Sequence, residues 1–391
     1  MKTKYTGTKI ACYVGYVVQA IVNNFLPILF IALRDMYGLT YEELARILVF
    51  NFATQMVTDY LAPKILKFTG YRGASLLAHV SATLGLVLLG VLPKITDNTY
   101  LVIVISMIIT AFGSGLIEVI LSPMMEMLPT SNKAGNMAVM HSFYCWGQAF
   151  TTVVTTVMVI GFGYQKWIAV PIIWAVIPFI NIFAFLKVPV IEPDKDEKKD
   201  SFFTLMKDKR FILFLIMMMC AGASEITMAQ WASMFAQQSL HVSKAVGDLA
   251  GPCAFALFMG VGRIWYAKVS HKVSFYKTVI ILSVLCFLCY VTVGVCKIPF
   301  IALICCALCG VTVSVFWPGT YSAGAKIFKN GGAVMFSAFA MFGDIGCSIG
   351  PWIFGIVADG FGLNWGFIAS AFFPVLMIIV SVIINKKYEV N

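Results

Sequence analysis

Polar side chains recur every four residues along one very apolar stretch of the sequence. They are Thr110, Ser114, Glu118, Ser122 and Glu126. On a helix this spacing places them along one slowly rotating face. A charged side chain at the centre of a membrane helix costs roughly 3 kcal/mol on insertion scales and is usually functional. We therefore predict that this face lines water, that Glu118 takes up and releases protons, and that Glu126 is a solvated residue near the helix end.

Two other stretches carry uncharged hydrogen-bonding groups at helical spacing. The candidates are Gln19, Asn23 and Asn24 in the first stretch, near Tyr16, and His141, Tyr144 and Gln148 in the second. Amides pair with hydroxyl groups, and aromatic faces cover C–H surfaces, so this mixture suits a polyhydroxylated ligand. A single amide could instead join two helices, a contact worth about 0.6 kcal/mol. The three coordinated stripes together favour a substrate site.

The second half of the sequence repeats this mixture of carboxylates and aromatic residues. The candidates are Glu225 and Asp344 for proton coupling, and Trp231, Trp317 and Tyr321 for substrate binding, with Pro318 predicted to kink the helix beside Trp317. Glycines flank Asp344, and they could serve only close helix packing. We interpret His79 as a structural histidine.

The composition places nearly the whole chain in a membrane. Hydrophobic residues make up 60% of the 391 residues and charged residues only 12%, whereas soluble domains carry about a quarter charged residues. About 20 apolar residues cross a bilayer as a helix, so a chain of this length can hold about a dozen spans. The eleven cysteines lie mostly in apolar segments without metal-ligand spacing, so we expect packing residues, no metal and no cofactor.

Twelve apolar segments separated by short polar turns predict an all-α integral membrane fold of two six-helix bundles. The predicted helices are 10–33, 41–61, 73–92, 100–127, 137–160 and 167–186, then 211–238, 245–269, 276–295, 300–328, 334–357 and 365–384. The domains are an N-terminal bundle (1–186), a charged cytoplasmic linker (187–210) and a C-terminal bundle (211–391). Duplicated bundles of this kind bind substrate near the midplane, between the halves.

The distribution of basic residues predicts the orientation. Of the 28 Lys and Arg residues, only Arg34, Arg46, Lys94, Lys166, Lys244 and Lys297 would face outside if the N-terminus is cytoplasmic. Cytoplasmic loops carry the excess of Lys and Arg. We therefore predict a multi-pass protein of the inner (plasma) membrane with both termini and the linker in the cytoplasm.

Three charged residues near the ends of predicted helices are candidates for gating. Asp59 and Lys64 follow the second helix with the same spacing as Arg263 and Lys268 after the eighth, and Arg72 lies in the short turn after Gly70. This echo favours duplication, although the positive-inside rule alone could produce it. We assign Asp59, Arg72 and Arg263 to gating, with Arg263 among the basic residues of a cytoplasmic segment.

One part of the sequence resembles a known family. The runs from Gly113 through Glu118 to Pro123 and from Met137 through His141 to Gln148 resemble the fourth and fifth helices of the fucose and glucose/galactose symporters, a branch of the major facilitator superfamily. The resemblance implies that Glu118 is the protonatable coupling residue. Members of the branch related to fucose permease carry an acidic residue shortly before the first-helix proline. Here Asn23 and Asn24 precede Pro27, so the second carboxylate of a two-site proton relay is missing.

The leading functional hypothesis is proton-coupled uptake of a sugar or sugar-like solute by alternating access. Its partners would be a small carbohydrate substrate, protons and the lipid bilayer, with no nucleic acid, and we expect a monomer. An exporter of drugs or amphipathic metabolites is the alternative, because Met217, Met218 and Met219 and the many phenylalanines suit such ligands. A channel or a receptor remains open. An enzyme is not expected, since the sequence has no H-E-x-x-H motif and only four widely spaced histidines.

The linker gives the sharpest test of the predicted orientation. A cysteine or tag introduced at Asp196 should be modified only from the cytoplasm, because the linker holds the densest group of basic residues in the chain. Labelling of intact cells and of inverted vesicles with a membrane-impermeant reagent measures this directly. Modification from the outside would reverse the orientation.

Overall fold

The structure is a computed structural model that describes residues 5–29, 33, 36–39, 41–96, 98–192 and 200–388. Arg34 and the linker segment 193–199, which includes Asp196, lie outside the described residues. The described chain contains helices and no β-strand. This follows from the composition, because a helix satisfies its own backbone N–H and C=O groups where no water is present.

Ten helices in the described part of the chain are long and apolar enough to cross a membrane. One of them lies within α3 (Tyr41–Val91), which is two helices joined at Gly70. A further long helix is α5 (Lys133–Phe162), with 30 residues. These elements account for the twelve predicted helices and confirm the predicted fold class.

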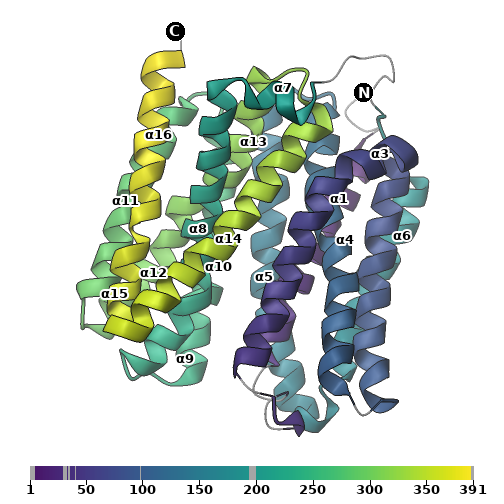
Figure 1. Ribbon diagram of the computed structural model, residues 1–391, viewed down its shortest axis with the longest axis vertical. Coiled ribbons are helices and arrows are strands. Elements are labelled where there is room, and N and C mark those ends of the chain that lie inside the picture. Colours follow the sequence, from purple (N-terminus) through teal and green to yellow (C-terminus); the bar gives the residue numbers. More distant parts are fainter. Residues whose placement is uncertain are drawn as a thin grey trace. The chain divides into compact units, whose positions relative to one another are not determined.

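The helices group by contact into two compact units. The first unit comprises Met1–Thr130 and Phe150–Glu197. It contains α1 (Thr6–Ile28), α3, α4 (Thr99–Met127), the end of α5 and α6 (Ala169–Lys187). Within it α3 packs against α4 and α6, and α1 also packs against α4 and α6 (Figure 1).

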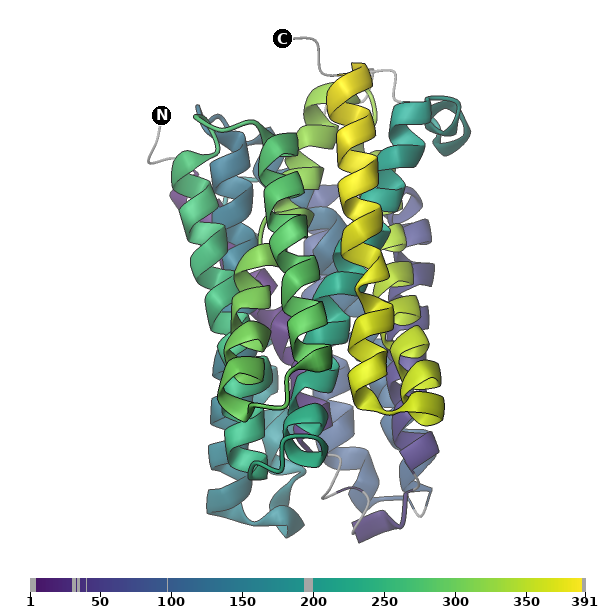
Figure 2. The ribbon, with the colours of Figure 1, turned by 90° about the vertical axis from the view of Figure 1, so that its left-hand side faces the viewer.

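The second unit comprises Ser131–Ala149 and Lys198–Asn391. Its long helices are α8 (Lys209–Gln238), α10 (Ala254–Val269), α11 (Phe275–Val295), α12 (Pro299–Val313), α13 (Phe316–Ile327), α14 (Gly332–Phe361) and α16 (Phe372–Tyr388). Short helices are α7 (Phe202–Met206), α9 (Lys244–Asp248) and α15 (Leu363–Ser370), and a π-helical turn, Leu249–Cys253, precedes α10. Within the unit, α8 packs against α14, α10 against α12, and α16 against α11 and α8 (Figure 2).

The grouping by contact differs from the predicted six-plus-six division at α5. The segment Ser131–Ala149, which contains the first part of this helix, belongs to the second unit, whereas the rest of the helix belongs to the first. Contacts with α10 account for the difference: Asn132 donates to the Ala267 carbonyl at 3.1 Å, and Ser270 donates to Asn132 at 3.1 Å. The boundaries 1–186 and 211–391 stay a prediction.

A glutamate at the start of the linker organises the kink in α3. Gly70 adopts φ 65° and ψ 176°, and the second helix of α3 begins at the next residue. The Glu192 carboxylate accepts hydrogen bonds from the backbone N–H groups of Tyr71 at 2.9 Å and Arg72 at 3.2 Å. The first N–H groups of a helix have no partner within it, so this carboxylate caps the second helix.

The side chain of Arg72 caps a helix in return. Its guanidinium donates to the carbonyls of Phe185 at 2.6 Å, Leu186 at 2.8 Å and Val188 at 2.8 Å, at the C-terminal end of α6. A cation is favourable there because the last carbonyls of a helix are unpaired. Arg72 therefore has a structural role in the first unit, and its assignment to gating stays a prediction.

Replacing Gly70 by alanine should destabilise the kink. The φ and ψ of Gly70 fall in a region that is essentially limited to glycine, where other residues cost about 1–3 kcal/mol, and an added Cβ would lie 3.1 Å from the Glu192 carboxylate. We expect a lower thermal midpoint for purified Gly70→Ala in detergent. Gly161→Ala, at a helical position with no atom within 4 Å of the added Cβ, is the control and should leave the midpoint nearly unchanged. Equal midpoints for the two variants would contradict the strain at Gly70.

Candidate functional site

The polar stripes predicted on the first and fourth helices face each other in the first unit. Gln19 on α1 donates to the Glu118 carboxylate on α4 at 2.6 Å. One turn away, Tyr16 pairs with Ser122 at 2.9 Å. The residue order along α1 is opposite to that along α4, as antiparallel helices require. The two stripes are therefore one interface, and Glu118 lies in its middle.

An amide cluster continues this interface from α1 to α3. The Asn23 side-chain oxygen lies 3.4 Å from Asn51 Nδ2, 3.3 Å from Gln55 Nε2 and 3.5 Å from Ser114 Oγ. Ser114 also donates to Gln55 Oε1 at 3.2 Å. These distances are longer than the usual 2.9–3.0 Å. A bound hydroxyl group that approaches more closely can therefore compete for the same atoms.

The predicted water-lining face of α4 is wrong as stated. Ser114 and Ser122 are fully buried and Glu118 is 6% exposed, because α1 packs on this face. Asn24, the neighbour of Asn23, instead donates to the carbonyl of Ala20 in its own helix at 2.8 Å. The structure thus brings Gln19 and Asn23 of α1 against the face of α4 that carries Glu118.

His79 has the structural environment that the sequence predicts. It is fully buried, its Nε2 lies 2.9 Å from the Asn181 side chain, and its Nδ1 lies 2.8 Å from the Ser75 carbonyl. Asn181 in turn donates to the Ala11 carbonyl at 3.0 Å. The histidine and the asparagine tie α3 and α6 to α1.

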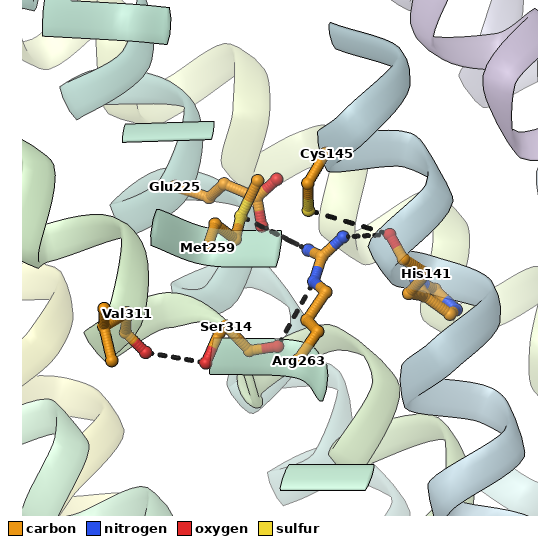
Figure 3. Close-up of polar contacts among 7 residues, drawn as sticks. All are labelled: His141, Cys145, Glu225, Met259, Arg263, Val311 and Ser314. Carbon is orange, nitrogen blue, oxygen red and sulfur yellow. Dashed lines mark hydrogen bonds and ion pairs between the residues drawn. The ribbon is translucent and has the colours of Figure 1, made fainter. Parts of the chain in front are cut away.

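A polar centre of the second unit is built around Arg263 on α10 (Figure 3). Arg263 is 2% exposed. Its Nη2 lies 3.2 Å from the Glu225 carboxylate on α8, and its Nη1 donates to the His141 carbonyl on α5 at 2.6 Å. Its Nε donates to the Ser314 carbonyl at 3.3 Å. Arg263 is therefore a buried residue within α10 that is balanced by Glu225, and its assignment to the cytoplasmic side stays a prediction.

The sequence explains why the Ser314 carbonyl can accept from an arginine. In a continuous helix this carbonyl would pair with the N–H of the residue four positions later. That residue is Pro318, which has no N–H. The helix breaks between α12 and α13 at this point, and Arg263 supplies the missing donor.

Aromatic candidates gather on α13 beside α5. The His141 ring lies 5.8 Å from the Tyr321 ring, and Tyr321 lies 6.3 Å from Trp317. Tyr321 also stacks on Phe336 at 5.3 Å. Trp231 lies apart from this group and stacks on Phe354 at 4.6 Å. Of the three aromatic candidates, Trp317 and Tyr321 thus share one environment with His141.

Asp344 lies where α14 packs closely on α8. It is 3% exposed, and an added Cβ at the nearby Gly346 or Gly350 would overlap the α8 backbone. The segment 346–350 also matches the G-x-S-x-G motif that holds the nucleophilic serine of many hydrolases. Here the segment lies within α14, and its Ser348 hydroxyl donates to the Asp344 carbonyl of the same helix at 2.9 Å. A nucleophile elbow needs a strand–turn–helix, so these glycines serve helix packing.

Three further candidates lie on α3 and α5. Asp59 is fully buried within α3, Gln148 is 7% exposed, and Tyr144 is half-buried. The described residues contain no group of three or more His, Cys, Asp or Glu side chains that could hold a metal ion. The proposed roles of Asp59, Tyr144 and Gln148 stay predictions.

Sequence reasoning missed Asn51, Gln55, Asn181 and Glu192. A signal existed for two of them, since Asn51 and Gln55 are four residues apart and Asp59 follows at the same spacing, which places all three on one helix face. Glu192 had no such signal, because its partners lie in a turn far away in the sequence.

Comparisons with known structures agree with this all-helical membrane fold. An Escherichia coli fucose:proton symporter, FucP, in a single-substitution variant, shares 14% identity, with a TM-score of 0.80 over 97% of this chain and 98% of the other. A FucP structure in the outward conformation gives 15% identity and a TM-score of 0.81, over 97% of this chain and 99% of the other. The proton:xylose symporter XylE, bound to 6-bromo-6-deoxy-D-glucose, shares 12% identity with a TM-score of 0.85, over 99% of this chain and 96% of the other. At these identities the likeness shows the fold alone.

The fold and its buried polar groups are those of a multi-pass membrane transporter. Residues 12–351 match the family model of the Major Facilitator Superfamily, and the chain belongs to this family. It is therefore a transporter rather than an enzyme. No curated protein matches the sequence significantly.

Two adjacent asparagines allow a matched test of the amide cluster. Asn23→Ala removes the oxygen that Asn51, Gln55 and Ser114 approach. Leaving a ligand hydroxyl unpaired costs about 1–3 kcal/mol, so substrate affinity should fall about tenfold. Asn24→Ala is the control, because the Asn24 amide bonds its own helix, and it should change affinity much less. Equilibrium binding of the substrate to purified protein measures the affinity of both variants. An unchanged affinity in Asn23→Ala would show that this cluster serves only helix packing.

Proposed function

We propose that this transporter takes up a sugar or sugar-like solute together with protons, by alternating access. The substrate would be bound by neutral amide and hydroxyl groups, and the proton would be carried by Glu118. The inner membrane, the cytoplasmic termini and the monomeric state belong to the same proposal. The FucP and XylE likenesses support it only through the shared fold.

The observation that carries the proposal is the contact between Glu118 and Gln19. A carboxylate 6% exposed, held at 2.6 Å by a neutral amide, can keep its place in either protonation state. When Glu118 is protonated, the amide can turn its oxygen toward the acid hydrogen, because an amide both donates and accepts. A proton can therefore be gained or lost without disassembly of the interface.

The amide cluster next to Glu118 supplies the second half of the proposal. Asn23, Gln55 and Ser114 lie about one helical turn from the carboxylate. They carry no charge, and together they offer both donors and acceptors, as a polyol requires. A sugar bound here would lie beside the proton carrier. Coupling follows if the two access states differ in their affinity for the proton.

The other two carboxylates fit proton coupling less well. Glu225 is held at 3.2 Å by Arg263, and a proton on it would leave the arginine's buried charge without its balance. Asp344 lies on a closely packed helix surface. Both remain candidates, after Glu118.

Glu118→Gln tests coupling in proteoliposomes that are supplied with a panel of labelled monosaccharides. Glutamine mimics the protonated acid and keeps its shape, so accumulation driven by a pH gradient should be lost. Exchange of substrate for substrate should continue, because exchange needs the conformational switch but no net proton movement. Glu126→Gln, two turns further along α4, is the matched control and should still accumulate substrate.

Two results would contradict this proposal in different ways. Accumulation by Glu118→Gln under a proton gradient alone would exclude Glu118 as the coupling residue and make Glu225 or Asp344 the next candidate. A wild-type protein that transports none of the monosaccharides but expels amphipathic dyes would favour the exporter.

A further inference from the structure

Arg263 donates to a carbonyl of α5 that has no local need of a donor. The His141 carbonyl lies inside a continuous helix, where the N–H of Cys145 is its expected partner. The guanidinium nevertheless approaches it at 2.6 Å, closer than it approaches Glu225 or Ser314 (Figure 3). A charged donor strengthens such a bond, particularly away from water. This contact therefore fixes α5 at one point of its length.

The first part of α5 follows α10 on both sides of that point. At one end Asn132 bonds Ala267 and Ser270, and an added Cβ at Gly135 would lie 2.7 Å from the Ala267 carbonyl. At the other end Ala149 packs with Cys253 and Ala256. Small residues let the two backbones approach closely. The Arg263 contact lies between these two ends.

One consequence is that the rotation of α5 about its own axis is set. His141, Tyr144 and Gln148 are spaced three and four residues apart, so they share a face of α5. Contacts between small side chains alone allow a helix to slide and rotate, whereas a directional hydrogen bond to one carbonyl holds it at one rotation. The face that carries these three candidates is thus oriented by an arginine on another helix.

Glu225 makes this arrangement possible. A buried guanidinium needs a compensating charge, and Glu225 supplies it from α8 at 3.2 Å, while Met259 lies against the same nitrogen at 3.4 Å. The side chains of Arg263 and Glu225 are 2% and 7% exposed. The pair is therefore a neutral unit that can be buried while it presents donors to α5 and to Ser314.

We propose that Arg263 is a positioning residue of α5: balanced by Glu225, it clamps the His141 carbonyl and sets the rotation of the helix face that carries the substrate-binding candidates His141, Tyr144 and Gln148. The effect on substrate rests on the proposed function. The clamp itself does not, since it is a property of α5 and α10.

Two variants separate the clamp from simple stability. Arg263→Lys keeps the charge and loses the planar fork of donors. Arg263→Met combined with Glu225→Met removes both charges together, and replacing a buried ion pair by apolar residues is often neutral or stabilising. Arg210→Lys is the matched control, because Arg210 also pairs with a carboxylate, Asp208, at 2.7 Å, but outside this site.

The first measurement needs no substrate. Diethylpyrocarbonate modifies histidine rings, and peptide mass spectrometry reads each histidine separately. His141 is 4% exposed and His79 is fully buried in the first unit. We expect faster modification of His141 in both variants, with His79 still protected and Arg210→Lys equal to wild type. Unchanged protection of His141 overturns the proposal, and so does equal exposure of His141 and His79, which would indicate general unfolding.

The second measurement uses the monosaccharide that the wild-type protein transports. In both Arg263 variants, counterflow in proteoliposomes should show KM raised about tenfold, as for the loss of a ligand hydrogen bond. The kcat should be nearly unchanged, because the substrate-binding side chains are misplaced while the conformational switch is intact. A fall in kcat with unchanged KM overturns the positioning role. If no monosaccharide is transported, the proposed function fails, and the histidine footprint still decides the role of Arg263.

Discussion

The cost of a polar group without a partner governs this structure. A chain that is 60% hydrophobic and only 12% charged leaves its buried polar groups with little access to water, so partners inside the protein stabilise them. Backbone groups do so by forming helices. Where a helix is interrupted, side chains complete the pairing: Glu192 caps the N–H groups after Gly70, Arg72 caps the end of α6, and Arg263 bonds the Ser314 carbonyl.

The same constraint gives two buried glutamates two different environments. Glu118 accepts a hydrogen bond from the neutral amide of Gln19, and the proposed change of its protonation state would require only that this amide group turn. Glu225 balances an arginine, and its charge is needed wherever the arginine is buried. One environment suits a group that titrates during transport, and the other suits a group that keeps a helix in place. Residue type alone does not distinguish them, because the difference lies in the partner.

The sequence predicted the helices well, but it did not predict which residues pair between helices. Helical spacing identified both the stripe through Glu118 and the stripe through Gln19, but it did not show that the two stripes pair with each other, because spacing fixes the face of a helix and not what covers that face. Counting basic residues placed Arg263 in a cytoplasmic segment, since a count treats every arginine near a helix end alike. Its burial depends on Glu225, His141 and Ser314, which are brought to it by three other segments of the chain. Gly70 and Glu192 were beyond reach for the same reason, whereas Asn51 and Gln55 carried a spacing signal.

Pro318 and Arg263 show how an irregular backbone and a functional side chain depend on each other. Proline frees the Ser314 carbonyl, and a free carbonyl away from water is tolerated only where another group satisfies it. Arginine can satisfy it and still hold further acceptors, because its donors point in several fixed directions. Lysine, a single point of charge, could not hold Glu225, His141 and Ser314 in the same geometry. The break at Ser314 therefore requires an arginine, and the buried arginine requires the Glu225 carboxylate. The remaining donor of Arg263 reaches the His141 carbonyl of α5. The break between α12 and α13 thus determines, through Arg263, that α5 is held and that it is held at His141.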